Sequence, residues 1–305
     1  MLSNALLVLS YVIILFVLIG IGVVANKIKL ISSNGIKDLT NVVLYIVTPC
    51  VLINSYQREF NEEMLMGLGI TVLASVISFA LNILISHLLI HDKDKRREKT
   101  LIFGSVFSNC GFMSLPLQEA ILGSEGVFYG ATYVAVFQIL IWTYGVIEMS
   151  GDLKNISWKK IIINPGVIGT VVGVIIFVFS LKVPFVVSEP IRFMAALNTP
   201  IPMIIVGYRL ADASLKIKGA SAWVSIILRL VVSPLIMIGV LYLFGISGAI
   251  MVACTVAAAA PCAANTTMFA EKFGGDVGMS SAMVSLTTLL SVITMPVIVA
   301  LAMSL

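Results

Sequence analysis

The stretch FSNCGFMSLPLQEAILGSEG, residues 107–126, interrupts a run of apolar sequence that is long enough to cross a membrane. It places Asn109, Gly111 and Pro116 at the depth where a lipid-facing helix would carry Leu or Val. Proline removes a backbone N–H and clashes with the preceding turn, so it leaves backbone groups unpaired. Lipid cannot pair with those groups, and such a break is tolerated only where it is buried in protein or lines a cavity. The stretch therefore predicts a broken membrane helix next to a functional cavity.

The whole chain has the composition of a polytopic membrane protein. Of its 305 residues, 59% are hydrophobic and 11% are charged, whereas soluble domains carry about 25% charged residues. Runs of about 20 apolar residues, each long enough to cross a bilayer, recur from end to end. We predict an all-α fold with ten transmembrane helices, at residues 4–25, 38–56, 64–90, 100–122, 126–148, 163–181, 190–210, 220–244, 248–272 and 278–303.

The distribution of lysine and arginine predicts the orientation of these spans, because cytoplasmic loops are enriched in both residues. If both termini lie outside, the inner loops hold almost all of the 19 basic residues. The outer loops then hold only Arg58, Lys182 and Arg192, and Arg229 lies within a span. We therefore expect a plasma-membrane protein with both termini extracytoplasmic. The net charge of +4 lies in these loops and gives no indication of a nucleic-acid partner.

The two halves of the chain, residues 1–151 and 152–305, resemble each other at an offset of 151 positions. The offset aligns Gly22 with Gly173, Arg58 with Arg209, and the Thr-Pro pair at 48–49 with the pair at 199–200. Each half holds five predicted spans, and an odd number means that the second half enters the membrane from the opposite side. This is the inverted repeat found in many secondary transporters.

The second half also contains a broken span, AAAAPCAANTTMFAEKFGGD, at residues 257–276. Paired interruptions at corresponding places in two repeats indicate the binding site of a transporter. The helix ends at a break offer free N–H groups and a partial positive charge, which suits an anion. The alternative is that Pro and Asn only kink and cap these spans. The predicted substrate-binding residues are Thr48, Ser108, Asn109, Cys110, Pro116, Asn198, Thr199, Arg229, Pro261, Asn265 and Thr266.

Arg229 is the residue of this set whose burial in the membrane costs the most free energy, because it is charged. A charge within a span marks a functional site by default. Two interpretations remain open from the sequence. The guanidinium could attract an anion into an inward-facing cavity, or it could pair with a helix end.

The two broken spans resemble the auxin efflux carrier family, which includes plant auxin exporters and bacterial permeases for organic anions. SNCGFMSLP matches the family's Asn followed seven residues later by Pro, and the ninth span resembles its Pro-bearing stretch. The resemblance implies ten helices in two inverted repeats, with the fourth and ninth helices broken and crossing. It also implies a scaffold of helices 1, 2, 6 and 7, a transport bundle of helices 3–5 and 8–10, a homodimer and an elevator-like movement. The chain departs from the plant pattern at Ser108 and Thr266, where those exporters carry proline.

We therefore predict a transporter that exports small organic anions, such as indole carboxylates, malate or malonate, without a cofactor or a metal. A sodium-coupled symporter of the bile-acid type is the alternative, since it shares the five-plus-five plan. Oxygen ligands for sodium could come from the side chains of Asn109, Gln138, Asn265, Thr266 and Thr267. An enzyme is disfavoured because the chain contains neither H-E-x-x-H nor G-x-S-x-G.

Overall fold

The computed structural model describes residues 2–213, 215, 217 and 219–305, except for the side chains of Leu2 and Lys160. Lys216 and Lys218, which the orientation argument counts as inner, lie outside the described residues. Within the described part the chain is helical, and its longest unbroken helices are α1 (Leu2–Lys27), α4 (Glu62–Leu89) and α17 (Val277–Ala302). The prediction of an all-α membrane fold is confirmed.

Each predicted span overlaps one or more helices. The second is α2 (Ser33–Val42), η1 (Val43–Val47) and α3 (Thr48–Ser55), and the fourth is α5 (Lys95–Val106), η2 (Cys110–Ser114) and α6 (Leu115–Leu122). The fifth is α7 (Ser124–Trp142) and α8 (Tyr144–Ser150); η3 (Leu153–Asn155) and α9 (Trp158–Ile162) lead to the sixth, α10 (Pro165–Val178). The seventh is α11 (Phe185–Ala196) and α12 (Pro200–Ala211), and the eighth is α13 (Ala220–Ile227), η4 (Leu228–Val232) and α14 (Ser233–Leu243). The ninth is α15 (Gly248–Ala259) and α16 (Asn265–Phe273).

Seven helical segments among the described residues are long and apolar enough to cross a membrane by length and composition. The fourth, sixth and ninth predicted spans are not among them, because α10 is short and the other two are interrupted. The count of ten spans therefore stays a prediction.

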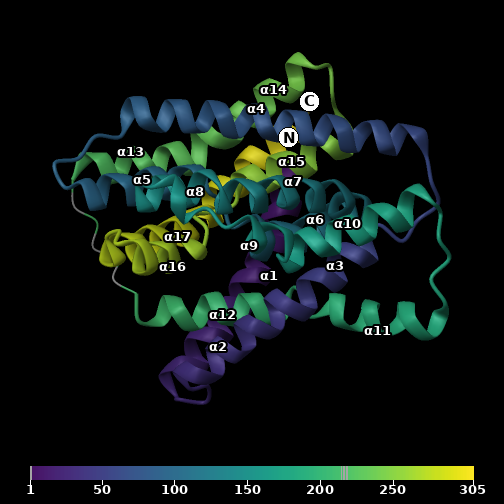
Figure 1. Ribbon diagram of the computed structural model, residues 1–305, viewed down its shortest axis with the longest axis horizontal. Coiled ribbons are helices and arrows are strands. Elements are labelled where there is room, and N and C mark those ends of the chain that lie inside the picture. The colour runs from purple at the N-terminus through teal and green to yellow at the C-terminus, as the bar shows by residue number, and fades with distance from the viewer. Residues whose placement is uncertain (1, 214, 216, 218) are drawn as a thin grey trace.

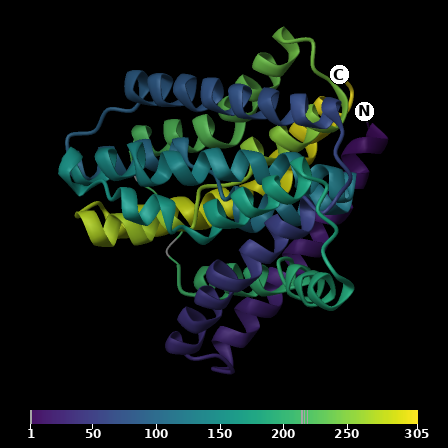
Figure 2. The same ribbon diagram turned by 45° about the vertical axis from the view of Figure 1, so that its right-hand side comes forward.

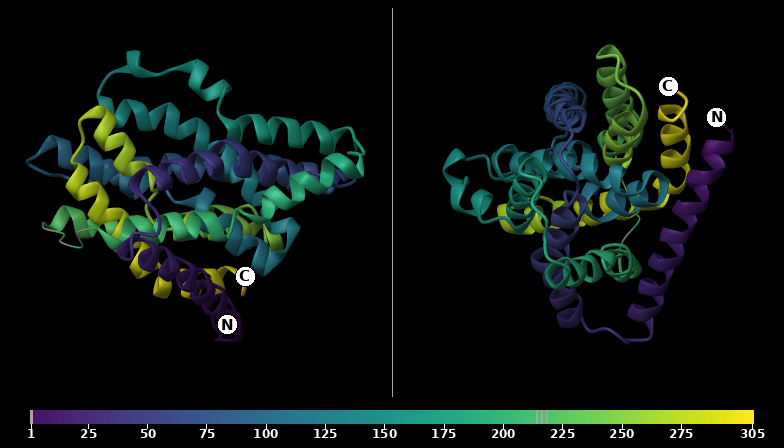
Figure 3. Two further views of the ribbon diagram at one scale, coloured as in Figure 1. Left: turned by 90° about the horizontal axis from the view of Figure 1, so that it is seen from below. Right: turned by 90° about the vertical axis from the view of Figure 1, so that its right-hand side faces the viewer.

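The helices form two groups. In Figure 1, α2, α11 and α12 lie along the bottom of the molecule, while α4, α5, α7, α13 and α15 lie above them. Figure 2 shows the same separation from another direction. Helix α1 packs against both α12 and α17, and Figure 3 shows the two chain termini close together.

Glycines allow close packing between α1 and α12 and between α10 and the end of α3. A Cβ at Gly22 of α1 would lie 2.2 Å from the carbonyl oxygen of Ile204, and one at Gly207 of α12 would lie 1.9 Å from that of Ile19. Gly173 of α10 makes the equivalent approach to Tyr56, next to α3, where a Cβ would lie 2.5 Å from the ring. Small residues permit close backbone packing of this kind in membrane helices.

Candidate functional site

The interruptions of the fourth and ninth segments lie against each other in the interior. Ser108 and Cys262 form an isolated antiparallel bridge. The Asn109 N–H donates to the Pro261 carbonyl at 2.7 Å, and the Ala263 N–H donates to the Phe107 carbonyl at 2.9 Å. These two bonds pair the extended backbone at the breaks, which lipid could not do.

The two breaks have different local causes. Ala260 is extended, with φ −59° and ψ 147°, because the residue before a proline is disfavoured in the helical region, and α15 ends there. The fourth segment instead breaks at Phe107–Asn109, whereas Pro116 is the second residue of α6. Pro116 is therefore part of the helix that follows the break, not of the crossing itself. Pairing with residues 261–263 holds the break open.

Arg229 binds the carboxyl ends of both helices that lead into the breaks. Its guanidinium is fully buried and donates to the carbonyls of Ser105 and Val106, at 3.1 and 2.8 Å, at the end of α5. It also donates to the Ala258 carbonyl of α15 and to the Ser233 hydroxyl. A helix carboxyl end carries about half a negative charge, so one arginine offsets two such ends. The structure therefore agrees with the interpretation that Arg229 pairs with helix ends.

The amino ends of the following helices keep their donors free. The N–H groups of Cys110, Gly111 and Phe112, which open η2, donate to no backbone carbonyl among the described residues. The same holds for Ala264 and Asn265 at the start of α16. These ends carry a partial positive charge and unpaired donors, a combination that binds anions.

Two asparagine side chains add polar groups at the same place. Asn109 is 6% exposed, and neither its amide nor that of Asn265 makes a side-chain hydrogen bond within the described part of the chain. Both amides border small cavities. Asn265 is half-buried, and amides at a cavity without a protein partner keep their donors and acceptors for a ligand or water.

Two cavities of about 30 Å³ each flank the crossing. The first lies between the crossing, α12 and α17 and is lined by Asn109, Phe112, Ile205, Val206, Arg209, Leu210, Ala264, Val284, Ser285 and Thr288. The second faces η1 and α7 and is lined by Leu44, Thr48, Ser108, Asn109, Gly111, Phe112, Val134, Phe137, Gln138, Ala263, Ala264 and Asn265. Each has room for roughly one or two waters. The surrounding elements must move apart to admit an organic anion.

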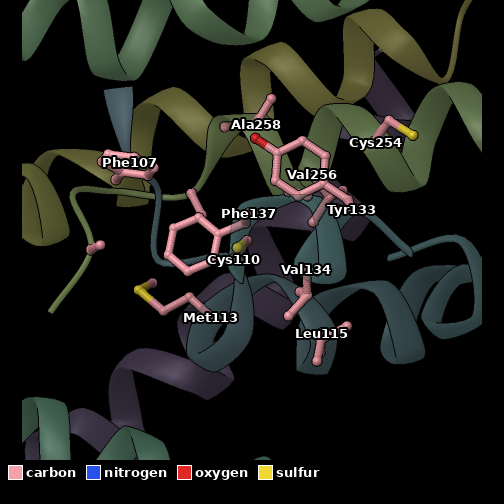
Figure 4. Close-up of a cluster of buried hydrophobic side chains, with 14 of the residues drawn as sticks. Phe107, Cys110, Met113, Leu115, Tyr133, Val134, Phe137, Cys254, Val256 and Ala258 are labelled. Atoms are coloured by element: carbon pink, nitrogen blue, oxygen red, sulfur yellow. The ribbon is translucent and has the colours of Figure 1, made fainter. Parts of the chain in front are cut away.

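The structure brings four of the predicted residues to these cavities, namely Thr48, Ser108, Asn109 and Asn265. The remaining predicted residues do not line either cavity. Thr266 lies 3.2 Å from the Cys262 thiol. Cys110 lies in a buried apolar cluster with Met113 and Phe137 (Figure 4).

The other residues outside the cavities are Pro116, Pro261, Asn198, Thr199 and Arg229. Pro261 contributes its carbonyl to the crossing, where it accepts the hydrogen bond from the Asn109 N–H. Asn198 and Thr199 lie between α11 and α12, where Asn198 is 3% exposed.

Four polar residues that line the cavities were not predicted as binding residues, namely Gln138, Arg209, Ser285 and Thr288. Gln138 was foreseen only as a sodium ligand. Arg209 entered the sequence analysis as an inner basic residue and as the repeat partner of Arg58, because it lies at the end of a predicted span. Ser285 and Thr288 lie within an apolar helix without any local signal.

Comparison with known proteins places the chain in a family. A family model described as membrane transport protein matches residues 7–156 and 152–299. The chain belongs to this family. It is the auxin efflux carrier family, so the resemblance predicted from the two broken spans is confirmed.

Two members of the membrane transport protein family from archaea align with nearly the whole chain. One is an uncharacterized transporter of Methanothermobacter thermautotrophicus, 24% identical over 92% of this chain and 93% of its own length. The other is an uncharacterized transporter of Methanocaldococcus jannaschii, 21% identical over 93% of this chain and 96% of its own length.

Proposed function

We propose that this member of the family is a secondary transporter that exports small organic anions across the plasma membrane by elevator-type alternating access. One observation carries the proposal: two helix amino ends with unpaired N–H groups and two unpaired amides border the same small cavities. Arg229 meanwhile offsets the opposing carboxyl ends. The local field at the crossing then favours an anion.

The proposed topology has ten spans in two inverted five-span repeats, with both termini outside. The charge distribution among the loops supports it. Close packing supports the repeat, because the offset of 151 relates Gly22, packed on α12, to Gly173, packed beside α3.

In the proposed mechanism, α1–α3 and α10–α12 form the scaffold and the dimer contact, and the remaining helices carry the substrate. The glycine crossings between α1 and α12 support a rigid scaffold. The two crossing breaks belong to the moving part, so the site would move with it. Export of an anion needs no coupling ion where the cell interior is negative, since about 2.3 kcal/mol per charge per 100 mV already favours it.

The proposal is tested by binding. A thermal-shift screen of the purified protein against mono- and dicarboxylates identifies the best anion, because a ligand of the folded state raises its apparent stability. Equilibrium titrations then compare the parent with two Asn109 variants. Losing one hydrogen bond to a charged ligand costs about 1.5–3 kcal/mol, so Asn109→Ala should bind roughly ten- to a hundredfold more weakly.

Asn109→Asp should bind more weakly still, because it sets one carboxylate against another. Asn34→Ala, at an exposed position in α2, serves as the control and should bind like the parent. An Asp variant with the parent's affinity would refute an anion site at the crossing.

The sodium-coupled alternative has support in the second cavity, where Thr48, Gln138 and Asn265 place side-chain oxygens around one space. The same titrations in sodium and in choline salts separate the two functions. Anion binding that requires sodium would favour the symporter, and equal binding in both salts favours uncoupled export.

A further inference from the structure

Arg209 is the only charged residue among the described residues that line the two cavities. It lies in the last turn of α12 and shares the first cavity with Asn109 of the crossing and with Ser285 and Thr288 of α17. The first cavity is therefore bordered by a full positive charge, which the anion-binding function proposed above does not use.

The guanidinium of Arg209 is available to a ligand. It makes no hydrogen bond and no ion pair with any described residue, in contrast to Arg229, which donates to three carbonyls and a hydroxyl. Glu271 of α16 is near enough to attract it electrostatically, but the two side chains form no ion pair within 4 Å. Five N–H donors thus remain for a group that enters the cavity.

A carboxylate is the group that this donor set fits best, because a guanidinium can bind it through two parallel hydrogen bonds. Asn109 and the helix amino ends already suit one carboxylate. A ligand that enters the first cavity would meet both Asn109 of this polar site and Arg209.

We propose that Arg209 binds a second carboxylate, so that the site prefers a short dicarboxylate to the corresponding monocarboxylate. This inference rests on the proposed function, since it assumes that an anion occupies the crossing. It adds a specificity-determining residue that lies on α12, outside both broken helices.

Half-amides provide a matched test. Succinate and succinamate, like malonate and malonamate, have nearly the same shape and differ by one negative charge. The parent should bind each dicarboxylate at least about tenfold more tightly than its half-amide, because a hydrogen bond to a charged partner is the stronger one. Arg209→Gln should bring this ratio close to one by weakening only the dicarboxylate, and Arg209→Lys should keep part of it.

Arg96→Gln is the control. Arg96 is an exposed arginine in the first turn of α5, 71% exposed in its side chain, and it lines neither cavity. The Arg96→Gln substitution removes one positive charge from the predicted inner side, as Arg209→Gln does, but away from the cavities. It should therefore leave the ratio of dicarboxylate to half-amide affinity unchanged.

The outcomes separate the two proposals. A parent that does not distinguish the dicarboxylate from the half-amide, or an Arg209→Gln variant with the parent's ratio, overturns the role of Arg209 while anion binding at Asn109 stands. If neither compound of either pair binds the parent, or if the Asn109 variants bind with the parent's affinity, the proposed function is wrong. The role of Arg209 is then wrong as well.

Discussion

Replacing Arg229 with methionine tests how the crossing is held together. The side chain keeps a similar length but loses every donor to the carbonyls of Ser105, Val106 and Ala258. Those three carbonyls lie in the interior, where lipid and packed side chains offer no replacement. Arg229→Met should therefore destabilise the folded protein rather than only weaken substrate binding.

The expected magnitude follows from the number of carbonyls left without a donor. Each buried unsatisfied group costs about 1–3 kcal/mol, so the three together cost about 3–9 kcal/mol. Folded domains are stable by only about 5–15 kcal/mol, which makes this loss a large share of the total. Arg229→Lys should cost less, because an ammonium group can still donate to one or two of the carbonyls.

The measurement is the midpoint of thermal denaturation in detergent, followed by size-exclusion chromatography. One kcal/mol shifts this midpoint by about 2–4 °C in a domain of 150–250 residues, so Arg229→Met should lower it by more than about 5 °C. Arg192→Met, at an exposed arginine paired with Glu189, should keep the parent's midpoint. An Arg229→Met protein with the parent's midpoint but no anion binding would refute the role at the helix ends and favour direct contact with the substrate.

Two further predictions concern topology and packing. Cysteines at the exposed positions Ser124 and Asn155 should react with a membrane-impermeant reagent from outside and inside respectively, and labelling of both from one side of intact cells contradicts the proposed topology. Gly207→Ala would place a Cβ 1.9 Å from the Ile19 carbonyl oxygen and should cost at least about 1–3 kcal/mol. Its thermal midpoint should fall, whereas that of Gly20→Ala, with open space around it, should not; an unchanged Gly207→Ala midpoint contradicts the close α1–α12 crossing.

The ninth break could be located from the sequence, and the fourth only in part. Proline at 261 acts on the residue directly before it, so the end of α15 at Ala259 follows from a local rule. Pro116 points to the right span but lies seven residues after Asn109, inside the helix that follows. The extended backbone at Ser108 depends on its pairing with Cys262, and a partner 154 positions away in the chain leaves no local pattern.

The two arginines show the same limit. A charge in an apolar run identified Arg229 as important, but the carbonyls that it binds lie 29 to 124 positions away. Arg209 lies at the end of its span, where a basic residue satisfies the orientation rule, and this hid its position at the first cavity. The sequence pattern identified the charge that is energetically unfavourable within the membrane. The packing of α12 against the crossing determines which arginine lines the cavity.

A broken membrane helix does not by itself favour an anion. Each break brings a carboxyl end and an amino end to the same depth, and their opposite partial charges oppose each other for a ligand nearby. Arg229 removes this opposition, because it occupies the carboxyl ends of α5 and α15 and leaves the amino ends of η2 and α16 open. The positive field expected at Asn109 therefore depends on a residue that lines neither cavity, and Arg209 adds a full charge at the first cavity. Arg229 fixes the sign of the site, and we expect Arg209 to set how many negative charges it accepts.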